Sequence, residues 1–150
     1  MESKRHYQQT KLMNIELGCR NTPREGYDGV DMGNWGQKYK GDAETILKTF
    51  KDESVDKIYA SHFFEHLYPD DIVTMIKQVR RVLKTGGQAW IIVPHKDHER
   101  ANVIWHKSYW TEFTFKDMAE YFDFEIIELV TNERLDIHCK MIKENLKTIL

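Results

Sequence analysis

The feature that most constrains the fold is a pair of short apolar runs separated by only nine residues. The first run covers residues 12–17 and is followed by Gly18, and the second covers residues 27–30 and is followed by Asp31. Short apolar runs that end at a glycine or a carboxylate are typical of parallel strands whose carboxyl ends face a ligand. Parallel strands are usually joined through a helix, and nine residues can return along a strand only as an extended loop. The sequence therefore predicts an α/β sheet whose first connection has no helix.

Three residues at these strand ends have side chains or backbone properties that suit ligand binding. Gly18 allows a sharp turn and a close approach of the backbone to a ligand. Asp31 can accept two hydrogen bonds from a ribose diol, and Glu16 can accept from an ammonium group or an ordered water. A glycine turn after an apolar run is also common as simple punctuation between elements, so this pattern alone leaves both interpretations open.

The rest of the chain alternates strands and helices within one domain. Further strands are expected near residues 39–41, 55–60, 88–93, 124–130 and 135–141, and helices near 43–50, 70–84 and 115–122. Gly86 and Gly87 are expected to end the second helix, and Thr114 with Asp117 resembles a capping box for the third. A four-residue link makes the last two strands an antiparallel hairpin. We expect a domain over residues 11–142, with flexible tails at 1–10 and 143–150.

Composition and charge exclude several classes of function. The net charge is −2 and the pI is about 6.4, which gives no support for a nucleic-acid or anionic membrane surface. No apolar run is long enough to span a membrane, and no signal-peptide core is visible. The two cysteines, Cys19 and Cys139, are too few for a disulfide framework and are expected to be reduced in a cytoplasmic protein.

Several blocks of sequence resemble the class I S-adenosylmethionine-dependent methyltransferases, and most closely their small-molecule "type 11" branch. The most specific blocks are SVDKIYASHFFEHL and RVLKTGGQAWIIVP, and ELGCR, GVD, GDAETI and WHKSYWTEFTFKDMAEYFDFEIIEL agree with them. The resemblance implies a Rossmann-like, mostly parallel sheet with an antiparallel C-terminal strand, here with abbreviated helices in the first half. It also implies S-adenosylmethionine as cofactor and a small-molecule methyl acceptor.

The resemblance assigns cofactor contacts to ten positions. It implies that the methionine moiety lies against the first strand end, the ribose on Asp31, and the adenine beyond the second and third strands, with the fourth strand end closing the pocket. The implied residues are Glu16, Gly18, Cys19, Arg20, Asp31, Met32, Asp42, Ala43, Ser61 and His62. Arg20 replaces a glycine that the family usually has. It either binds the cofactor carboxylate in place of the missing helix N-terminus or fills the pocket.

Histidines are the candidate bases for an oxygen or nitrogen acceptor, because histidine titrates near neutral pH. His62 ranks first, then His95 and His106, although any of them can equally be an ordinary loop or capping residue. His62 to His66 also spells H-x-x-E-H, in which two histidines on a helix hold zinc beside Glu65 as base. The adjoining strand and Pro69 argue against that helix, so no metal is expected.

The leading hypothesis is therefore an enzyme that transfers a methyl group to a small molecule. A catalytically silent methyltransferase-like binding module is the alternative, and a zinc hydrolase through His62 and His66 is the third. Four aromatic residues in one polar loop either stack on the acceptor or cover the edge of the core: Trp105, Tyr109, Trp110 and Phe113. Short connections leave one sheet face thinly covered, so a homodimer or the N-terminal tail is expected to cover it.

Overall fold

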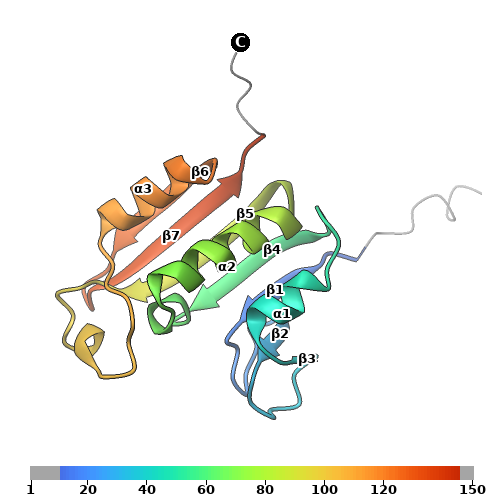
Figure 1. The fold of residues 1–150 in the computed structure, drawn as a ribbon, viewed down its shortest axis with the longest axis horizontal. Helices are drawn as coiled ribbons and strands as arrows, with labels where there is room; N and C mark the ends of the chain where they lie inside the picture. The colour runs from blue at the N-terminus through green and yellow to red at the C-terminus, as the bar shows by residue number, and fades with distance from the viewer. Residues whose placement is uncertain (1–10, 146–150) are drawn as a thin grey trace, which may run out of the picture.

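In the computed structural model, which describes residues 11–145, seven strands form one sheet in the order β3-β2-β1-β4-β5-β7-β6 (Figure 1). Strands β1 to β5 pair in parallel, whereas β7 runs antiparallel to both β5 and β6. This confirms the predicted Rossmann-like sheet with its antiparallel C-terminal strand. The strands are β1 (Asn14–Leu17), β2 (Asp28–Asp31), β3 (Tyr39–Lys40), β4 (Val55–Ser61), β5 (Leu83–Pro94), β6 (Phe124–Thr131) and β7 (Asp136–Lys143).

Among residues 11–145, three α-helices and two short 3₁₀ helices connect these strands. They are α1 (Ala43–Lys48), η2 (Phe64–His66), α2 (Pro69–Val82), η3 (Glu99–Asn102) and α3 (Glu112–Tyr121). Residues 18–26, between β1 and β2, contain no helix, as the short spacing predicted. Lys143, assigned by sequence to a tail, is the last residue of β7, and the other residues of the predicted tails at 1–10 and 146–150 lie outside the described part of the chain.

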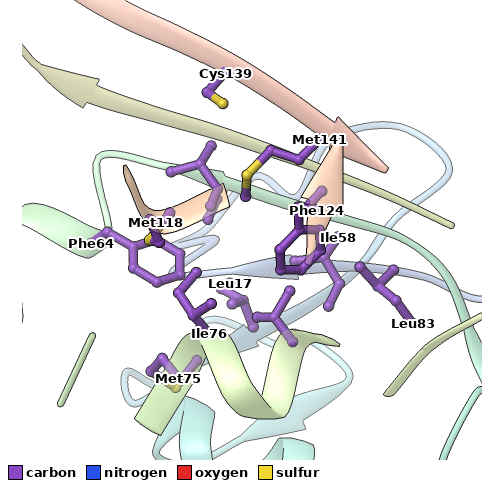
Figure 2. Packing of buried hydrophobic residues seen from close by; sticks show 14 of the residues in the cluster. Leu17, Ile58, Phe64, Met75, Ile76, Leu83, Met118, Phe124, Cys139 and Met141 are labelled. Atoms are coloured by element: carbon purple, nitrogen blue, oxygen red, sulfur yellow. The ribbon is translucent and has the colours of Figure 1, made fainter. Parts of the chain in front are cut away.

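The buried apolar residues of all three α-helices belong to a single cluster on one face of the sheet. Figure 2 shows Met75 and Ile76 of α2 and Met118 of α3 in this cluster. Alternate strand residues face this cluster because successive side chains in a strand point to opposite faces. Ile58 and Met141 from the strands pack there with Ile76 from α2. Phe64 in η2 is fully buried in the same cluster, and its ring centroid lies 6.2 Å from that of Trp110. The core therefore fixes the residues that flank Phe64.

The opposite face of the sheet is polar and aromatic. Tyr59 in β4 and Trp90 in β5 lie side by side there, with ring centroids 4.7 Å apart. The loop between β1 and β2 crosses this face. Its Arg24 guanidinium lies 4.7 Å from the Trp90 ring and 5.2 Å from the Tyr59 ring. A cation over aromatic rings thus replaces the apolar helix face that usually covers a parallel sheet.

Two predicted boundaries are wrong for reasons of tertiary structure. Helix α2 ends at Val82 rather than residue 84, and β5 begins at once with Leu83, which pairs with Val55 of β4. Gly86 and Gly87 therefore lie inside a strand and do not end the helix. At Gly87 a Cβ would lie 2.7 Å from the Lys84 carbonyl oxygen, so a side chain does not fit.

The predicted capping box of α3 is also misplaced. Thr111 is the N-cap, and its backbone N–H donates to the Thr114 hydroxyl, so Thr114 is the third helical residue and not the cap. Both cysteines are free and buried. Within residues 11–145, no helix has the length and apolar character needed to cross a bilayer.

Candidate functional site

A cleft of about 950 Å³ lies at the carboxyl ends of β1, β4 and β5. It is the position at which open α/β sheets bind ligands. The structure brings seven of the sequence-predicted residues to its walls: Glu16, Gly18, Cys19, Arg20, Ser61, His62 and His106. Its volume lies within the range of small-molecule sites, about 300–1,000 Å³.

Gly18 is required by the turn that ends β1. Its φ of +67° is in the left-handed region, and an added Cβ would lie 2.9 Å from Cδ1 of Phe63. Its N–H donates to the Val30 carbonyl at 2.8 Å, which joins the ends of β1 and β2. Arg20 also has a positive φ, +54°, and its side chain is exposed at the mouth of the cleft.

The buried carboxylate of Glu16 is bonded to the β1–β2 loop. One of its oxygens accepts the backbone N–H of Arg24. Burial raises the pKa of Glu16, and the hydrogen bond and positive charge of Arg24 only partly oppose that effect. Glu16 therefore holds the loop that stands in place of the missing helix.

The carboxylate of Asp31 is likewise engaged by its own chain. Oδ2 accepts the N–H of Arg20 at 2.9 Å, and Oδ1 accepts the N–H of Gly33 at 2.8 Å and Nε1 of Trp35 at 3.2 Å. Burial acts to raise the pKa of Asp31, but the hydrogen bonds from Gly33, Arg20 and Trp35 outweigh it, and the pKa lies below its usual value. The residue is therefore ionised at neutral pH.

Asp31 does not contribute to the lining of the cleft, and neither do four further predicted residues. Met32 follows β2 and is 73% exposed. Asp42 is the N-cap of α1, where it accepts from the N–H of Thr45, and Ala43 is the first residue of that helix.

His95, the fourth, is engaged outside the cleft. Its Nδ1 accepts the N–H of Asp97 at 3.1 Å, and its Nε2 lies 3.3 Å from Oε1 of Glu112. Both nitrogens therefore organise the loop that follows β5.

His62 follows β4 directly, with a φ of +55° that turns its side chain into the cleft wall. Its Nδ1 lies 3.3 Å from Oε2 of Glu65, and its Nε2 lies 3.9 Å from Oδ1 of Asp136. The hydrogen bond to Glu65 raises the pKa of His62, while burial acts in the opposite direction. The arrangement is a histidine oriented by a carboxylate, which is a common setting for a general base.

Sequence reasoning gave Glu65 and His66 a role only in the zinc-hydrolase alternative, yet both line the cleft with His106. Glu65 is 1% exposed, and its Oε1 has no hydrogen-bond partner among the described residues; the same holds for the buried Nδ1 of His106. The His66 and His106 rings meet edge to face with centroids 4.6 Å apart. The signal in the sequence was H-x-x-E-H, but the segment forms a 3₁₀ turn instead of the α-helix that the zinc-hydrolase alternative requires.

The aromatic residues of the loop after β5 were expected either to stack on the acceptor or to cover the edge of the core, and the structure shows that Trp105 and Trp110 differ in this respect. Trp110 is 1% exposed and packs in the core against Phe115, with ring centroids 4.9 Å apart. Trp105 lines the cleft and has more than half of its surface exposed. Trp105 is therefore available to an acceptor, whereas Trp110 is structural.

Comparison with known protein families gives a direct match. A family model described as "Methyltransferase domain" matches residues 14–91, which include β1 to β4, α2 and most of β5. The chain belongs to the methyltransferase-domain family. It is a methyltransferase, in agreement with the resemblance seen in the sequence blocks. No curated protein sequence matches the chain.

Solved structures share the fold of this methyltransferase at low sequence identity. A SAM-dependent methyltransferase from Archaeoglobus fulgidus is 20% identical with a TM-score of 0.72, covering 95% of this chain and 90% of its own. The 1,6-didemethyltoxoflavin-N1-methyltransferase of Burkholderia thailandensis, solved with 1,6-didemethyltoxoflavin and S-adenosylhomocysteine, is 14% identical with a TM-score of 0.67 and coverages of 95% and 76%. A putative methyltransferase in complex with the Haloferax volcanii Trm112 activator is 12% identical with a TM-score of 0.71 and coverages of 95% and 89%.

Proposed function

We propose that this methyltransferase modifies a small molecule that carries an O–H or N–H group, with His62 as the general base. The observation that carries the proposal is the position of His62 in the cleft wall, held through Nδ1 by the buried carboxylate of Glu65. Because Nδ1 of His62 bonds to Glu65, Nε2 of His62 is left to take a proton from the methyl acceptor. The similar fold from Burkholderia thailandensis, solved with a small heterocycle and S-adenosylhomocysteine, supports an acceptor of this size.

The cofactor would lie across the ends of β1 and β2. Glu16, Gly18 and Cys19 would contact the methionine moiety. Asp31 would accept from the ribose, because a carboxylate oxygen has two lone pairs and Oδ2 of Asp31 uses only one. The adenine would lie beside the exposed side chain of Met32, near the start of α1 at Asp42 and Ala43, and Ser61 would close the pocket from β4.

S-adenosylmethionine supplies an activated methyl group on a sulfonium sulfur. The residues of the chain need only align the acceptor in line with that group and remove its proton. When bound, S-adenosylmethionine would supply the methyl group and its sulfur would keep the electron pair of the broken carbon–sulfur bond, while Nε2 of His62 would take the proton of the acceptor. Trp105 would provide a flat surface against which an aromatic acceptor can stack.

The test is transfer of labelled methyl groups to a panel of phenols, amines and carboxylic acids. His62→Ala is expected to lower kcat about 10²- to 10⁴-fold, while affinity for S-adenosylhomocysteine stays near that of the wild type. His98→Ala is the matched control, because His98 lines the same cleft but its Nδ1 accepts the N–H of Arg100. Equal losses in both variants would contradict the role of His62. Binding without transfer to any acceptor would favour the silent module.

Two opposite roles are proposed for Arg20, and one titration distinguishes them. Either its guanidinium binds the cofactor carboxylate, or it fills the space that the cofactor needs. Calorimetric titration of Arg20→Ala with S-adenosylhomocysteine would show weaker binding in the first case and tighter binding in the second. Asn21→Ala, at the neighbouring cleft position, is the control.

We also propose that a second copy of the chain covers the polar-aromatic sheet face around Tyr59 and Trp90. The support is that all three α-helices bury their apolar residues on the other face. Light scattering should then report a dimer, and Trp90→Glu should yield a monomer. A monomeric wild type would overturn this proposal without affecting the catalytic one.

A further inference from the structure

We propose that Glu65, His66 and His106 form a binding site for one divalent transition-metal ion in the wall of the cleft. Each residue offers one ligand atom, and the three atoms lie within 4.8 Å of one another. All three residues line the cleft that holds His62. A metal site at this place departs from the sequence-based expectation of none.

The first support is that two of these groups are buried without a partner among residues 11–145. Oε1 of Glu65 and Nδ1 of His106 accept no hydrogen bond, and Glu65 is 1% exposed. A buried carboxylate oxygen without a donor costs free energy, because it has lost its hydrogen bonds to water and gained none in exchange. A carboxylate oxygen and two imidazole nitrogens, each able to offer a lone pair to a metal ion, lie within 4.8 Å of one another. That set is suited to a cation.

The second support is that the backbone holds the three residues together although they are distant in sequence. The carbonyl oxygen of Glu65 accepts the N–H groups of Lys107 at 2.8 Å and Ser108 at 3.2 Å. The Ser108 hydroxyl also donates to the Phe64 carbonyl at 3.2 Å. Because Phe64 is fixed in the core, His106 is held beside η2 before any ligand binds.

The third support is the partner of the remaining Glu65 oxygen. Oε2 of Glu65 lies 3.3 Å from Nδ1 of His62, so the carboxylate is oriented with Oε1 directed away from that contact. Metal ligands in proteins are commonly oriented by such outer hydrogen bonds. His62 is therefore a positioning residue for this site as well as the proposed base.

The ligand set identifies the chemical class of the ion. Two imidazoles and one carboxylate are typical of Zn²⁺, Fe²⁺ or Co²⁺, whereas Mg²⁺ and Ca²⁺ prefer oxygen ligands. Tetrahedral bonds of about 2.1 Å place ligand atoms roughly 3.4 Å apart, so separations of up to 4.8 Å must shorten by at most about 1.4 Å on binding. Three protein ligands leave a fourth position open to the cleft.

The open position gives the ion a role that rests on the proposed function. An oxygen or nitrogen of the acceptor can occupy it and be held beside the methyl donor, with its pKa lowered by the charge of the ion. The acceptors favoured by this arrangement carry a metal-binding group next to the methylated atom, as catechols and hydroxy acids do.

The test is direct metal binding by the full chain after dialysis against EDTA, without cofactor or acceptor. Titration with Co²⁺, followed by visible absorption, and with Zn²⁺, followed by calorimetry, is expected to give one ion per chain. Glu65→Gln and His106→Ala are each expected to weaken Zn²⁺ binding at least tenfold. His98→Ala, a histidine of the same cleft outside the cluster, is expected to bind as the wild type does.

Three outcomes would overturn the proposal: no stoichiometric uptake of Co²⁺ or Zn²⁺ by the wild type, wild-type affinity in both cluster variants, or equal loss in His98→Ala. Circular dichroism of each variant shows whether it is folded, and His66→Gln replaces any variant that is not. Binding of S-adenosylhomocysteine is measured on the same metal-free samples. Failure of metal binding with cofactor binding intact would overturn this inference alone, and the converse would overturn only the proposed methyl transfer.

Discussion

The two walls of the cleft differ in how their polar groups are paired. At the first wall, the carboxylate of Glu16, which lines the cleft, and that of Asp31, which binds the backbone of the cleft residue Arg20, accept hydrogen bonds from the loops of the chain itself. At the second wall, formed by η2 and the loop after η3, Oε1 of Glu65 and Nδ1 of His106 are buried without a partner among residues 11–145. The polar groups of the first wall are therefore paired without a ligand, whereas the second wall leaves two atoms free for one. A carboxylate in this fold can thus support a loop, bind a ligand, or do both.

Asp31→Ala is expected to have the largest effect on the free energy of unfolding, because it removes a carboxylate that pairs with the loops at the first wall. Three donors would lose their acceptor, so we expect the free energy of unfolding to fall by about 3 kcal/mol, since hydrogen bonds to charged groups contribute about 1.5–3 kcal/mol each and this site is partly exposed. Affinity for S-adenosylhomocysteine should fall at least tenfold. Urea denaturation and calorimetry measure the two effects. Asp42→Ala, which removes only a helix cap, should cost about 1 kcal/mol; equal costs would contradict the supporting role of Asp31.

Low pH should also reduce the contribution of Asp31 to the free energy of unfolding, but by less than Asp31→Ala does. The pKa of Asp31 is lower in the folded state than in the unfolded chain, so its contribution is fully present above the unfolded value, near pH 4, and is lost as pH falls through the folded value. A protonated carboxyl still accepts hydrogen bonds, which limits the loss. Urea denaturation from pH 7 to pH 3 should show the difference between wild type and Asp31→Ala constant above about pH 5 and shrinking below about pH 4. A constant difference throughout would show that the Asp31 pKa is the same in both states.

Arg24→Ala tests how much the loop gains from lying over the aromatic face. The backbone N–H of residue 24, whose hydrogen bond Glu16 accepts, is kept, whereas the contacts with the Tyr59 and Trp90 rings and the positive charge near Glu16 are lost. We expect a loss of about 1 kcal/mol in the free energy of unfolding, the usual size of a partly exposed cation–π contact. Arg100→Ala, at an exposed position in η3, should change it by less than about 0.5 kcal/mol. An equally small change in Arg24→Ala would mean that the backbone alone holds the loop.

Glu65→Gln should have the smallest effect on the free energy of unfolding. A small effect would distinguish Glu65, which lacks one partner, from Asp31, whose two oxygens are both paired. In EDTA the substitution replaces a buried carboxylate that lacks one partner by a neutral amide that can still accept from His62. We expect the free energy of unfolding to stay within about 0.5 kcal/mol of the wild type or to rise. A loss of more than about 2 kcal/mol, measured by urea denaturation, would show that Glu65 is already paired in the metal-free protein.

The sheet and one wall of the cleft were predictable because they follow from local patterns. Apolar runs that end at Gly18, Asp31 and Ser61 place these residues at strand ends, and parallel strands bring such ends together. The end of α2 was not predictable, because the pairing of Leu83 with Val55 lies 28 positions apart in the sequence and overrides the glycine signal at Gly86.

The second wall was predicted only in part. His62 and His106 were recognised as candidates, but their relation to Glu65 depends on hydrogen bonds from Lys107 and Ser108 to the Glu65 carbonyl, which no periodicity in the sequence reports. His95, which follows β5 directly, was ranked above His106, yet its nitrogens face Asp97 and Glu112 instead of the cleft. Position along a strand identifies a residue near the site; its side-chain partners decide whether it takes part.

The attachment of residues 107 and 108 to η2 also has a consequence for protein engineering. It fixes the positions of the reactive groups separately from the side chains that choose the acceptor. Within the segment 98–105, the Val103 carbonyl accepts the N–H of His106 at 3.0 Å, so the backbone of this segment helps to hold His106, whereas the side chain of Trp105 is exposed in the cleft. Substituting Trp105 while the backbone keeps its length should therefore change which acceptors the enzyme accepts while its reactive groups keep their positions.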